Sequence, residues 1–534
     1  MKKKIAALLS AAMLASVIFT ACAGAAPAAA PAPEAAAEEA APAAEAEAPA
    51  AEEAAPAEEA AAPEFDEITT IKVTLFDTRG VGEVAGPVFD AMNAITEQKI
   101  GVHADITMKS LAEYSTQLGL QLASGEQLDV ISLGFGATSF SSLVANGQLM
   151  DITDLIQEEA PETYAEVGEY LKVDSMGGRI YGIPPYRNYV SSSYMTMRKD
   201  ILEELGMLDQ ALSMTSWDQV EELFATVAEK TDLIPTGSGK NILWSGGYIF
   251  PGGDFADTIT FDTLSDPVGV IFADEETNQL SLLLENPNYR AEQEMIRDWY
   301  NKGWVYKDSP YEDNTSEIMI KTNVSFAMFG TSEFGIETAK TEAIGKEMVS
   351  LELASKPLAT ANVANFGLGI PVNAEEPEAG MRWINELYTN PDMINLMFWG
   401  IEGENYVVED GQAKYPDGVE PDKVGYHSVD FLYGNYFLGL PWIGSGADFR
   451  QQAKAILDAG ELSPYFGFRA NADNVVNIIS ALSAITEQYN GSIRCGAFTD
   501  ELYDEYIASL KANGVDDYIA DYQKQLDEWL AANN

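Results

Sequence analysis

The pattern of hydrophobic and polar positions changes sharply at residue 65 of this chain. From there on, short apolar runs alternate with longer segments in which apolar residues recur at helical spacing. The pattern predicts strands at residues 68–76, 102–108 and 129–133, and helices at residues 87–98 and 111–124. Gly125 follows the second helix and is expected to end it. Strands and helices that alternate in this way predict an α/β fold with parallel strands.

The loop after the third predicted strand, residues 134–138, is the first candidate binding element. It lies at the carboxyl end of a strand, where open α/β sheets bind ligands. The chain has 534 residues, of which 46% are hydrophobic. This is too long for one ordinary domain, so we expect two lobes of roughly 200 residues each.

Five short segments resemble, in the correct order, motifs of the extracellular solute-binding proteins of the family-1 type. They are LASGEQLDVI (122–131), LVANGQLMDITDLI (143–156), GRIYGIP (178–184), YMTMRKDIL (194–202) and TSWD (215–218). Further segments at residues 390–406 and 466–529 resemble a subfamily that carries an extra C-terminal region. Residues 236–289 match little, so ligand-specific loops are expected there.

The resemblance implies an α/β, two-lobed periplasmic-binding-protein-like (type II) fold with a hinge and an interlobe cleft. It places chain crossings near residues 186–190, 362–366 and 400–406. The first lobe would comprise residues 65–187 and 367–402, and the second lobe residues 188–366 and 403–534. It also implies a protein without enzymatic activity that delivers its solute to the permease of an ABC transporter. A monomer is expected, because a hinge that must close works best unencumbered.

The N-terminus predicts export and membrane attachment. A basic start and a short apolar run at residues 1–21 form a secretory signal. Residues 19–22 resemble a lipobox, so Cys22 is expected to carry the lipid and to anchor the protein at the extracellular face of the cell membrane. Residues 23–64 consist of Ala, Pro and Glu apart from Gly24, and predict an extended tether. The alternative is an ordinary secreted protein that is cleaved after an alanine.

Charge and composition exclude several classes of function. The net charge of −53 repels phosphate backbones, which makes a nucleic acid an unlikely partner. Two cysteines, Cys22 and Cys495, and two histidines leave little material for disulfides or for His- and Cys-ligated metals, so we expect no metal or cofactor.

A carbohydrate is the expected ligand, because aromatic faces pack on sugar rings while polar side chains bind the hydroxyls. Ten residues near predicted loops and the hinge are candidate contacts. The aromatic candidates are Phe135, Tyr186, Tyr189, Trp244, Trp399 and Trp442, and the polar candidates are Arg187, Asn188, Asp254 and Glu402.

Three alternatives remain open at this point. A peptide or another solute is an alternative ligand, since the charge of the whole chain says nothing about one cleft. A secreted carbohydrate-active enzyme would need two carboxylates flanking the scissile bond, and pairs of acids occur trivially among 84 acidic residues. An adhesion lipoprotein would carry the same tether and anchor, but it has no reason to carry a hinge.

Overall fold

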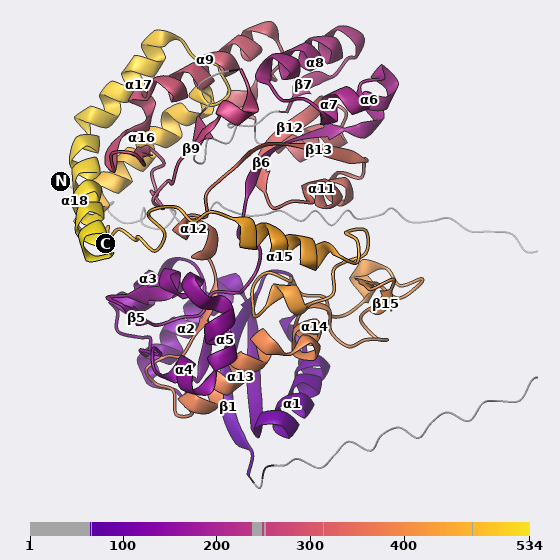
Figure 1. The fold of residues 1–534 in the computed structure, drawn as a ribbon, viewed down its shortest axis with the longest axis vertical. Helices are drawn as coiled ribbons and strands as arrows, with labels where there is room; N and C mark the ends of the chain where they lie inside the picture. The colour runs from indigo at the N-terminus through magenta and orange to yellow at the C-terminus, as the bar shows by residue number, and fades with distance from the viewer. Residues whose placement is uncertain are drawn as a thin grey trace, which may run out of the picture. The chain divides into compact units, whose positions relative to one another are not determined.

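The computed structural model describes residues 65–533, apart from residues 66, 238–247, 250–252, 313 and 473. Two separate four-stranded sheets organise this part of the chain, with strand orders β14-β3-β1-β2 and β13-β6-β12-β7. We call the body built on the first sheet the first lobe and the body built on the second sheet the second lobe (Figure 1). In this region no helix combines the length and the apolar character needed to cross a membrane.

The sheet of the first lobe follows the predicted pattern closely. Its strands are β1 (Thr69–Asp77), β2 (Val102–Ser110), β3 (Val130–Leu133) and β14 (Gly367–Gly369). The strand β1 runs parallel to both β2 and β3, as the strand–helix alternation predicted, whereas β14 is antiparallel to β3. The helices of this lobe are α1 (Gly86–Ile100), α2 (Leu111–Ser124), α3 (Phe140–Ala145), α4 (Leu155–Glu159), α5 (Pro161–Val167), α13 (Pro377–Thr389) and α14 (Pro391–Trp399). Gly125 ends α2 with a φ of 71°, a left-handed conformation that suits glycine.

The second lobe contains a mixed sheet in which antiparallel pairs predominate. Its strands are β6 (Ser192–Arg198), β7 (Ile234–Thr236), β12 (Ser325–Ser332) and β13 (Met348–Ser355). The strand β6 is antiparallel to both β12 and β13, and β7 is parallel to β12. The helices around it are α6 (Lys199–Leu205), α7 (Leu208–Leu212), α8 (Trp217–Lys230), α9 (Pro287–Lys302), α10 (Ser316–Lys321) and α11 (Ile336–Ile344).

Smaller hairpins and a set of C-terminal helices complete the described chain. The hairpins pair β4 (Ser175–Met176) with β5 (Arg179–Ile180), β8 (Tyr248–Ile249) with β9 (Ile259–Thr260), β10 (Ile271–Asp274) with β11 (Gln279–Leu282), and β15 (Val407–Glu409) with β16 (Gln412–Lys414). The remaining helices are α12 (Thr360–Val363), α15 (Phe449–Ala459), α16 (Val476–Ile493), α17 (Asp500–Ala512) and α18 (Val515–Asn533). In Figure 1, α12 and α15 lie between the two sheets, and α16 to α18 lie on the side of the second lobe.

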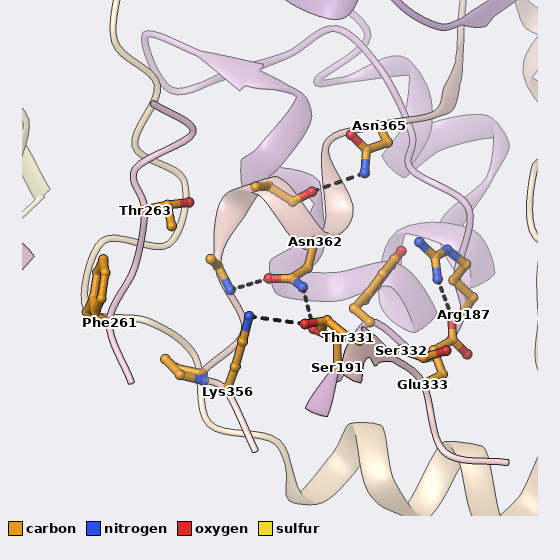
Figure 2. Close-up of a pocket in the computed structure, with 15 residues that line it drawn as sticks. Arg187, Ser191, Phe261, Thr263, Thr331, Ser332, Glu333, Lys356, Asn362 and Asn365 are labelled. Carbon is orange, nitrogen blue, oxygen red and sulfur yellow. Dashed lines mark hydrogen bonds and ion pairs between the residues drawn. The ribbon is translucent and has the colours of Figure 1, made fainter. Parts of the chain in front are cut away.

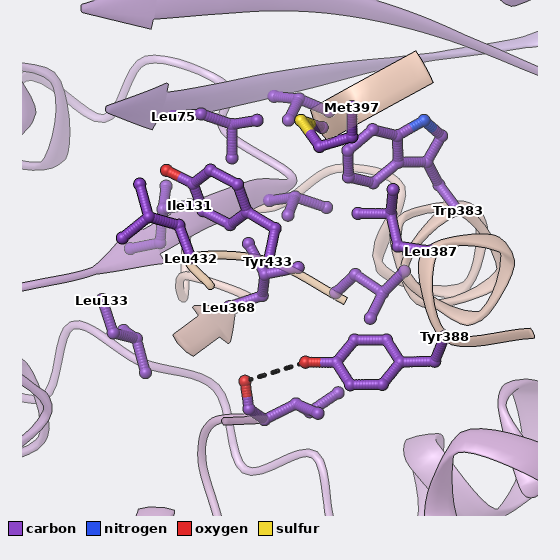
Figure 3. Packing of buried hydrophobic residues seen from close by; sticks show 14 of the residues in the cluster. Leu75, Ile131, Leu133, Leu368, Trp383, Leu387, Tyr388, Met397, Leu432 and Tyr433 are labelled. Atoms are coloured by element: carbon purple, nitrogen blue, oxygen red, sulfur yellow. Dashed lines mark hydrogen bonds between the residues drawn. The ribbon is translucent and has the colours of Figure 1, made fainter. Parts of the chain in front are cut away.

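The core of the first lobe shows that one expected chain crossing is misplaced. Leu432 and Tyr433 lie among Leu75, Ile131 and Trp383 in a single buried cluster (Figure 3). The hydroxyl of Tyr433 donates a hydrogen bond to the backbone oxygen of Phe76, the penultimate residue of β1. Residues around 403–438, which the sequence assigned to the second lobe, therefore pack in the first lobe.

The turn at Gly400 explains why the chain does not cross there. Gly400 has a φ of 89°, and the side chain of Asn405 accepts a hydrogen bond from the backbone nitrogen of Ile401 at 2.8 Å. The same side chain donates to the backbone oxygen of Val424 at 3.0 Å. This turn folds the chain back onto the first lobe, and only near Tyr465 does the chain join the buried cluster that the C-terminal helices form with residues 261–289.

Candidate functional site

The hinge segment that leads from the first lobe into β6 positions four of the predicted site residues. Tyr186 is buried, and its ring packs edge-to-face against Phe437 at 5.2 Å between centroids. Asn188 is fully buried and accepts a hydrogen bond from the backbone nitrogen of Val190 at 3.0 Å. Arg187 and Tyr189, which alternate with these residues, line a cavity. Arg187 thus lines the cavity, whereas Tyr189, which is 2% exposed, both lines the cavity and packs in the buried cluster of the first lobe.

The cavity has a volume of about 600 Å³ and is formed by segments that are far apart in the sequence. The hinge segment, the end of β12, the β13–α12 connection and the loop before β10 all contribute to it. Figure 2 shows these side chains around the cavity. The polar lining residues are Arg187, Ser191, Thr263, Thr331, Ser332, Glu333, Lys356, Asn362 and Asn365, and the aromatic ones are Tyr189 and Phe261.

A partly buried ion pair lies at one side of the cavity. The guanidinium of Arg187 donates to Glu333 at 2.6 Å and to the backbone oxygen of Asn188 at 3.0 Å. Burial raises the pKa of Glu333 to about 7, although Arg187 acts in the opposite direction. The carboxyl group therefore lies close to the point at which it can either donate or accept a hydrogen bond near neutral pH.

Other polar side chains of the cavity are held by hydrogen bonds to residues from other segments. Burial lowers the pKa of Lys356 to about 7, and its ammonium lies 3.5 Å from the hydroxyl of Thr331. The amide of Asn362 donates to Ser191 at 3.1 Å and accepts from the backbone nitrogen of Ala359 at 3.0 Å. These contacts fix the donors and acceptors in place, so that binding costs little side-chain ordering.

An aromatic surface continues from the cavity across the edge of the first lobe. Phe366 directly follows the cavity residue Asn365, and its ring lies 5.2 Å from Phe135 and 6.0 Å from Phe431. Phe135 is 49% exposed although it is a large apolar side chain. It lies in the loop after β3, at the carboxyl edge of the sheet, where the sequence predicted a binding element.

The other predicted site residues lie away from this cavity. Trp399 is buried and donates from its indole nitrogen to the backbone oxygen of Leu440 at 3.1 Å. Its ring contacts Trp442 at 5.1 Å between centroids, which places both tryptophans in a separate aromatic cluster of the first lobe. Asp254 and Glu402 are exposed. The candidates Trp244 and Cys22 lie outside the described residues.

Several cavity residues could not be recognised in the sequence. Glu333 and Lys356 come from strand ends that follow Arg187 by more than a hundred residues, and nothing distinguishes Glu333 among 84 acidic residues. Asn362 and Asn365 could have been predicted as site residues, because they are polar residues in a segment that was expected to cross between the lobes. Phe261 and Thr263 fall within residues 236–289, where ligand-specific loops were expected.

Known proteins resemble this chain over most of its length. A relative from Streptococcus pneumoniae serotype 4 (strain ATCC BAA-334 / TIGR4), described as a carbohydrate ABC transporter substrate-binding protein, is 25% identical over 451 residues. The match covers 82% of this chain and 87% of the relative.

Solved structures show the same fold. The N-glycan transport solute binding protein (NgtS) from Streptococcus pneumoniae superposes with a TM-score of 0.73 at 22% identity, covering 87% of this chain and 100% of that chain. NgtS has also been solved with Man1GlcNAc and with Man5GlcNAc. An HMO binding ABC-transporter associated solute binding protein from Bifidobacterium longum infantis ATCC 15697 gives a TM-score of 0.59 at 16% identity, with 87% of this chain and 100% of that chain covered.

Two family models match the chain. Residues 464–531 match a domain of unknown function (DUF3502). Residues 90–402, more than half of the chain, match the model described as bacterial extracellular solute-binding protein. Together with the two-lobed α/β fold and the polar cavity at its hinge, this match establishes that the chain belongs to the family of bacterial extracellular solute-binding proteins.

Proposed function

We propose that this protein is the substrate-binding lipoprotein of an ABC importer and that it captures an oligosaccharide between its two lobes. The observation that carries the proposal is the hinge cavity, in which Arg187, Glu333 and Asn362 surround a space bordered by aromatic rings. Sugar hydroxyls need paired donors and acceptors, and sugar C–H faces pack on aromatic rings. The relative and the solved structures described above, whose names refer to carbohydrate, N-glycan and HMO, support a carbohydrate as the ligand.

Closure of the lobes around the ligand is the proposed mechanism of capture. Phe135 belongs to the first lobe, and Phe366, at the crossing between the lobes, packs against it at 5.2 Å, while Glu333, Thr331 and Phe261 belong to the second lobe. A ligand that contacts both sets stabilises the closed form, since either lobe alone covers only part of it. To shift an open–closed equilibrium from 1:99 to 99:1, the ligand must bind the closed form about 5.5 kcal/mol more tightly. We propose the lobes as residues 65–187 with 367–438, and 188–366 with the C-terminal region, acting in a monomer.

The protein belongs to a family that binds solutes without converting them, and the cavity fits that role. Among the described residues that line it, Glu333 is the one carboxylate. A glycosidase needs two carboxyl groups on either side of the scissile bond. We therefore propose that Glu333 binds a hydroxyl group of the ligand, with Arg187 holding its carboxylate in place.

We also propose that the protein is anchored by lipid on Cys22 at the extracellular face of the cell membrane. The support is the basic and apolar segment at residues 1–21, the cysteine that follows it, and the Ala/Pro/Glu tether that separates it from the folded body. Incorporation of labelled palmitate into the wild-type protein, and its loss in Cys22→Ser, is the expected result. A wild-type protein that is released unlabelled into the medium would overturn the anchor.

Calorimetric titration and thermal-shift measurements of ligand binding test the central proposal. The mature chain would be titrated with Man1GlcNAc, Man5GlcNAc, fructo-oligosaccharides of different lengths and short peptides. A ligand at about 100 times its dissociation constant should raise the free energy of unfolding by about 2.7 kcal/mol. Glu333→Gln, which keeps the shape but weakens the pair with Arg187, should reduce the affinity about tenfold. The exposed Glu204 on α6 offers a matched control, Glu204→Gln, in which affinity should not change.

The outcomes separate the competing functions. Binding of one sugar class without product formation supports the proposal, whereas binding of peptides alone keeps the solute-binding role and rejects the carbohydrate. Cleavage of a glycan would contradict the proposal.

A further inference from the structure

The C-terminal region, residues 464–531, packs on one segment of the second lobe. Its helices share a buried cluster with residues 261–289, in which Tyr503, Tyr506 and Tyr518 are almost fully buried. Polar contacts tie the two parts together. The hydroxyl of Tyr503 donates to the backbone oxygen of Leu284 at 3.0 Å, and that of Tyr518 donates to Asp266 at 2.6 Å. The C-terminal helices are thus part of the structure that holds the loop before β10.

That loop has a strained conformation that these contacts maintain. Leu264 and Ser265 are consecutive non-glycine residues with φ values of 53° and 56°. Such left-handed residues persist only where the surrounding structure holds them. Asp262 accepts from the backbone nitrogen of Leu264 at 2.7 Å, and Asp266 accepts from three backbone nitrogens as well as from Tyr518. Phe261 and Thr263 lie just before this strained turn, with Asp262 between them. Both residues line the hinge cavity.

The same two residues also line a second cavity of about 300 Å³. Its far side is formed by Asn490 and Arg494 of the C-terminal region, and its apolar wall includes Val268. In Figure 2, Phe261 and Thr263 lie at the opposite side of the hinge cavity from Arg187 and Glu333. The second cavity therefore adjoins the hinge cavity at the end away from the ion pair.

A buried acid lies between the cations of the two cavities. Glu292 of α9 is 1% exposed, and burial raises its pKa well above the usual value. Arg494 in the second cavity and Lys356 in the hinge cavity both act on Glu292 in the opposite direction. Because burial favours the neutral form of Glu292, this group adds little negative charge, but burial also lowers the pKa of Lys356 to about 7, and the carboxyl group of Asp266 lines the second cavity together with Arg494. The two cavities together therefore present little net positive charge, which favours a neutral, hydroxyl-rich ligand over an anionic one.

Asn490 lines the second cavity and has a donor that such a ligand can use. Its side-chain oxygen accepts a hydrogen bond from the hydroxyl of Tyr506 at 3.1 Å. Within the described part of the chain no contact uses its side-chain nitrogen as a donor, so this group is available to a sugar hydroxyl. The hydroxyl of Thr263 offers a further donor or acceptor, and Phe261 offers an apolar surface between the two cavities.

We propose that the C-terminal region builds an additional sugar subsite, formed by Thr263, Asn490 and Arg494, that extends the hinge cavity. The inference rests on the proposed oligosaccharide-binding function and specifies its ligand as a neutral oligosaccharide with more units than the hinge cavity alone accepts. The C-terminal region thereby acquires a role in ligand selection.

Affinity as a function of ligand length tests the subsite. The mature chain and its variants would be titrated with Man1GlcNAc and Man5GlcNAc, and with fructo-oligosaccharides of three and five units. Asn490→Leu fills the subsite and removes its donor, so the longer ligand should bind about threefold to tenfold more weakly while the shorter one is unaffected. Thr263→Val, which removes one hydroxyl, should act in the same direction. Gln488 is exposed on the same helix, and Gln488→Leu is the matched control.

Hydrogen exchange in the wild-type chain provides a test that needs no variant. The longer ligand, and not the shorter one, should protect residues 259–271 and 488–496. The subsite is rejected if long and short ligands bind and protect equally, or if Asn490→Leu weakens both to the same extent. Absence of binding by every sugar would instead reject the proposed function itself, so the two failures are distinguishable.

Discussion

A buried contact between the C-terminal region and the first lobe leads to a prediction about pH. Asp174, which ends the 3-10 helix Gly168–Asp174, is 1% exposed, and Arg469 of the C-terminal region approaches it to 3.5 Å. Arg469 also donates to the backbone oxygen of Val173 at 2.9 Å. Burial raises the pKa of Asp174 to about 7, although Arg469 acts in the opposite direction. Desolvation of the carboxylate thus outweighs the ion pair.

The sign of the effect follows from linkage. The unfolded chain releases the proton of this carboxyl near pH 3.8 and the folded chain only near pH 7. Between these values the folded state holds more protons, so the free energy of unfolding falls as the pH rises, by about 1.4 kcal/mol per pH unit. Asp174→Asn keeps the shape of the side chain but does not titrate. The stability of the variant relative to wild type should therefore increase by about 2 kcal/mol from pH 5 to pH 7 and level off above pH 8.

Urea unfolding at pH 5, 6, 7 and 8 measures this difference directly. The groups that face Asp174 are Arg469, Tyr189 and Tyr388, and burial raises the pKa of both phenols, so neither titrates in this range. Asp90 is exposed on α1, and Asp90→Asn serves as the control whose stability relative to wild type should show no such increase. If Asp174–Arg469 were instead a stabilising ion pair, the pKa of Asp174 would lie below 3.8, and the relative stability of Asp174→Asn would not change between pH 5 and pH 8. Such a constant difference, or a relative stability that falls as the pH rises, would refute the reasoning.

Two further predictions concern the aromatic surface and the turn that returns the chain to the first lobe. Phe135→Ala should weaken oligosaccharide binding about tenfold in calorimetry. It should change the free energy of unfolding by less than about 1 kcal/mol, because the ring is 49% exposed. An unchanged affinity would show that Phe135 is not part of the site. Gly400→Ala should lower the free energy of unfolding, measured with urea, by about 2–3 kcal/mol. The reason is that φ at this position is 89° and a Cβ would lie 2.5 Å from the side-chain oxygen of Asn405. A loss below about 1 kcal/mol would show that the turn adapts to the added methyl group.

Periodicity predicted the elements of the first lobe well because each signal is local. The apolar spacing and terminal glycine of residues 111–125 were sufficient to place α2 at Leu111–Ser124. The lobe to which residues 403–438 belong was not predictable in this way. Leu432 and Tyr433 are apolar in either assignment, and only the tertiary structure shows that they pack against Leu75. The resemblance to known motifs predicted the fold, but it did not predict where the chain crosses between the lobes for the third time.

The candidate site was predictable only where chemistry and chain crossing coincide. Arg187 and Tyr189 were named because they lie at the first crossing, and they line the cavity. Their neighbours Tyr186 and Asn188 were named for the same reason, yet they are buried and do not line the cavity. Glu333 could not be identified, because its role depends on a long-range contact with Arg187 that no local pattern encodes.

The position of the cavity links the proposed binding to the proposed closure of the lobes. Arg187 and Ser191 lie on the first crossing between the lobes, and Lys356 and Asn362 lie before and within the second. The third crossing is hydrogen-bonded to the second, since the backbone nitrogen of Ser463 donates to the oxygen of Leu358 at 2.9 Å. A solute in this cavity therefore contacts the segments whose conformation sets the angle between the lobes. Its affinity must differ between open and closed forms to the extent that these segments move, and that difference is the free energy available to drive closure.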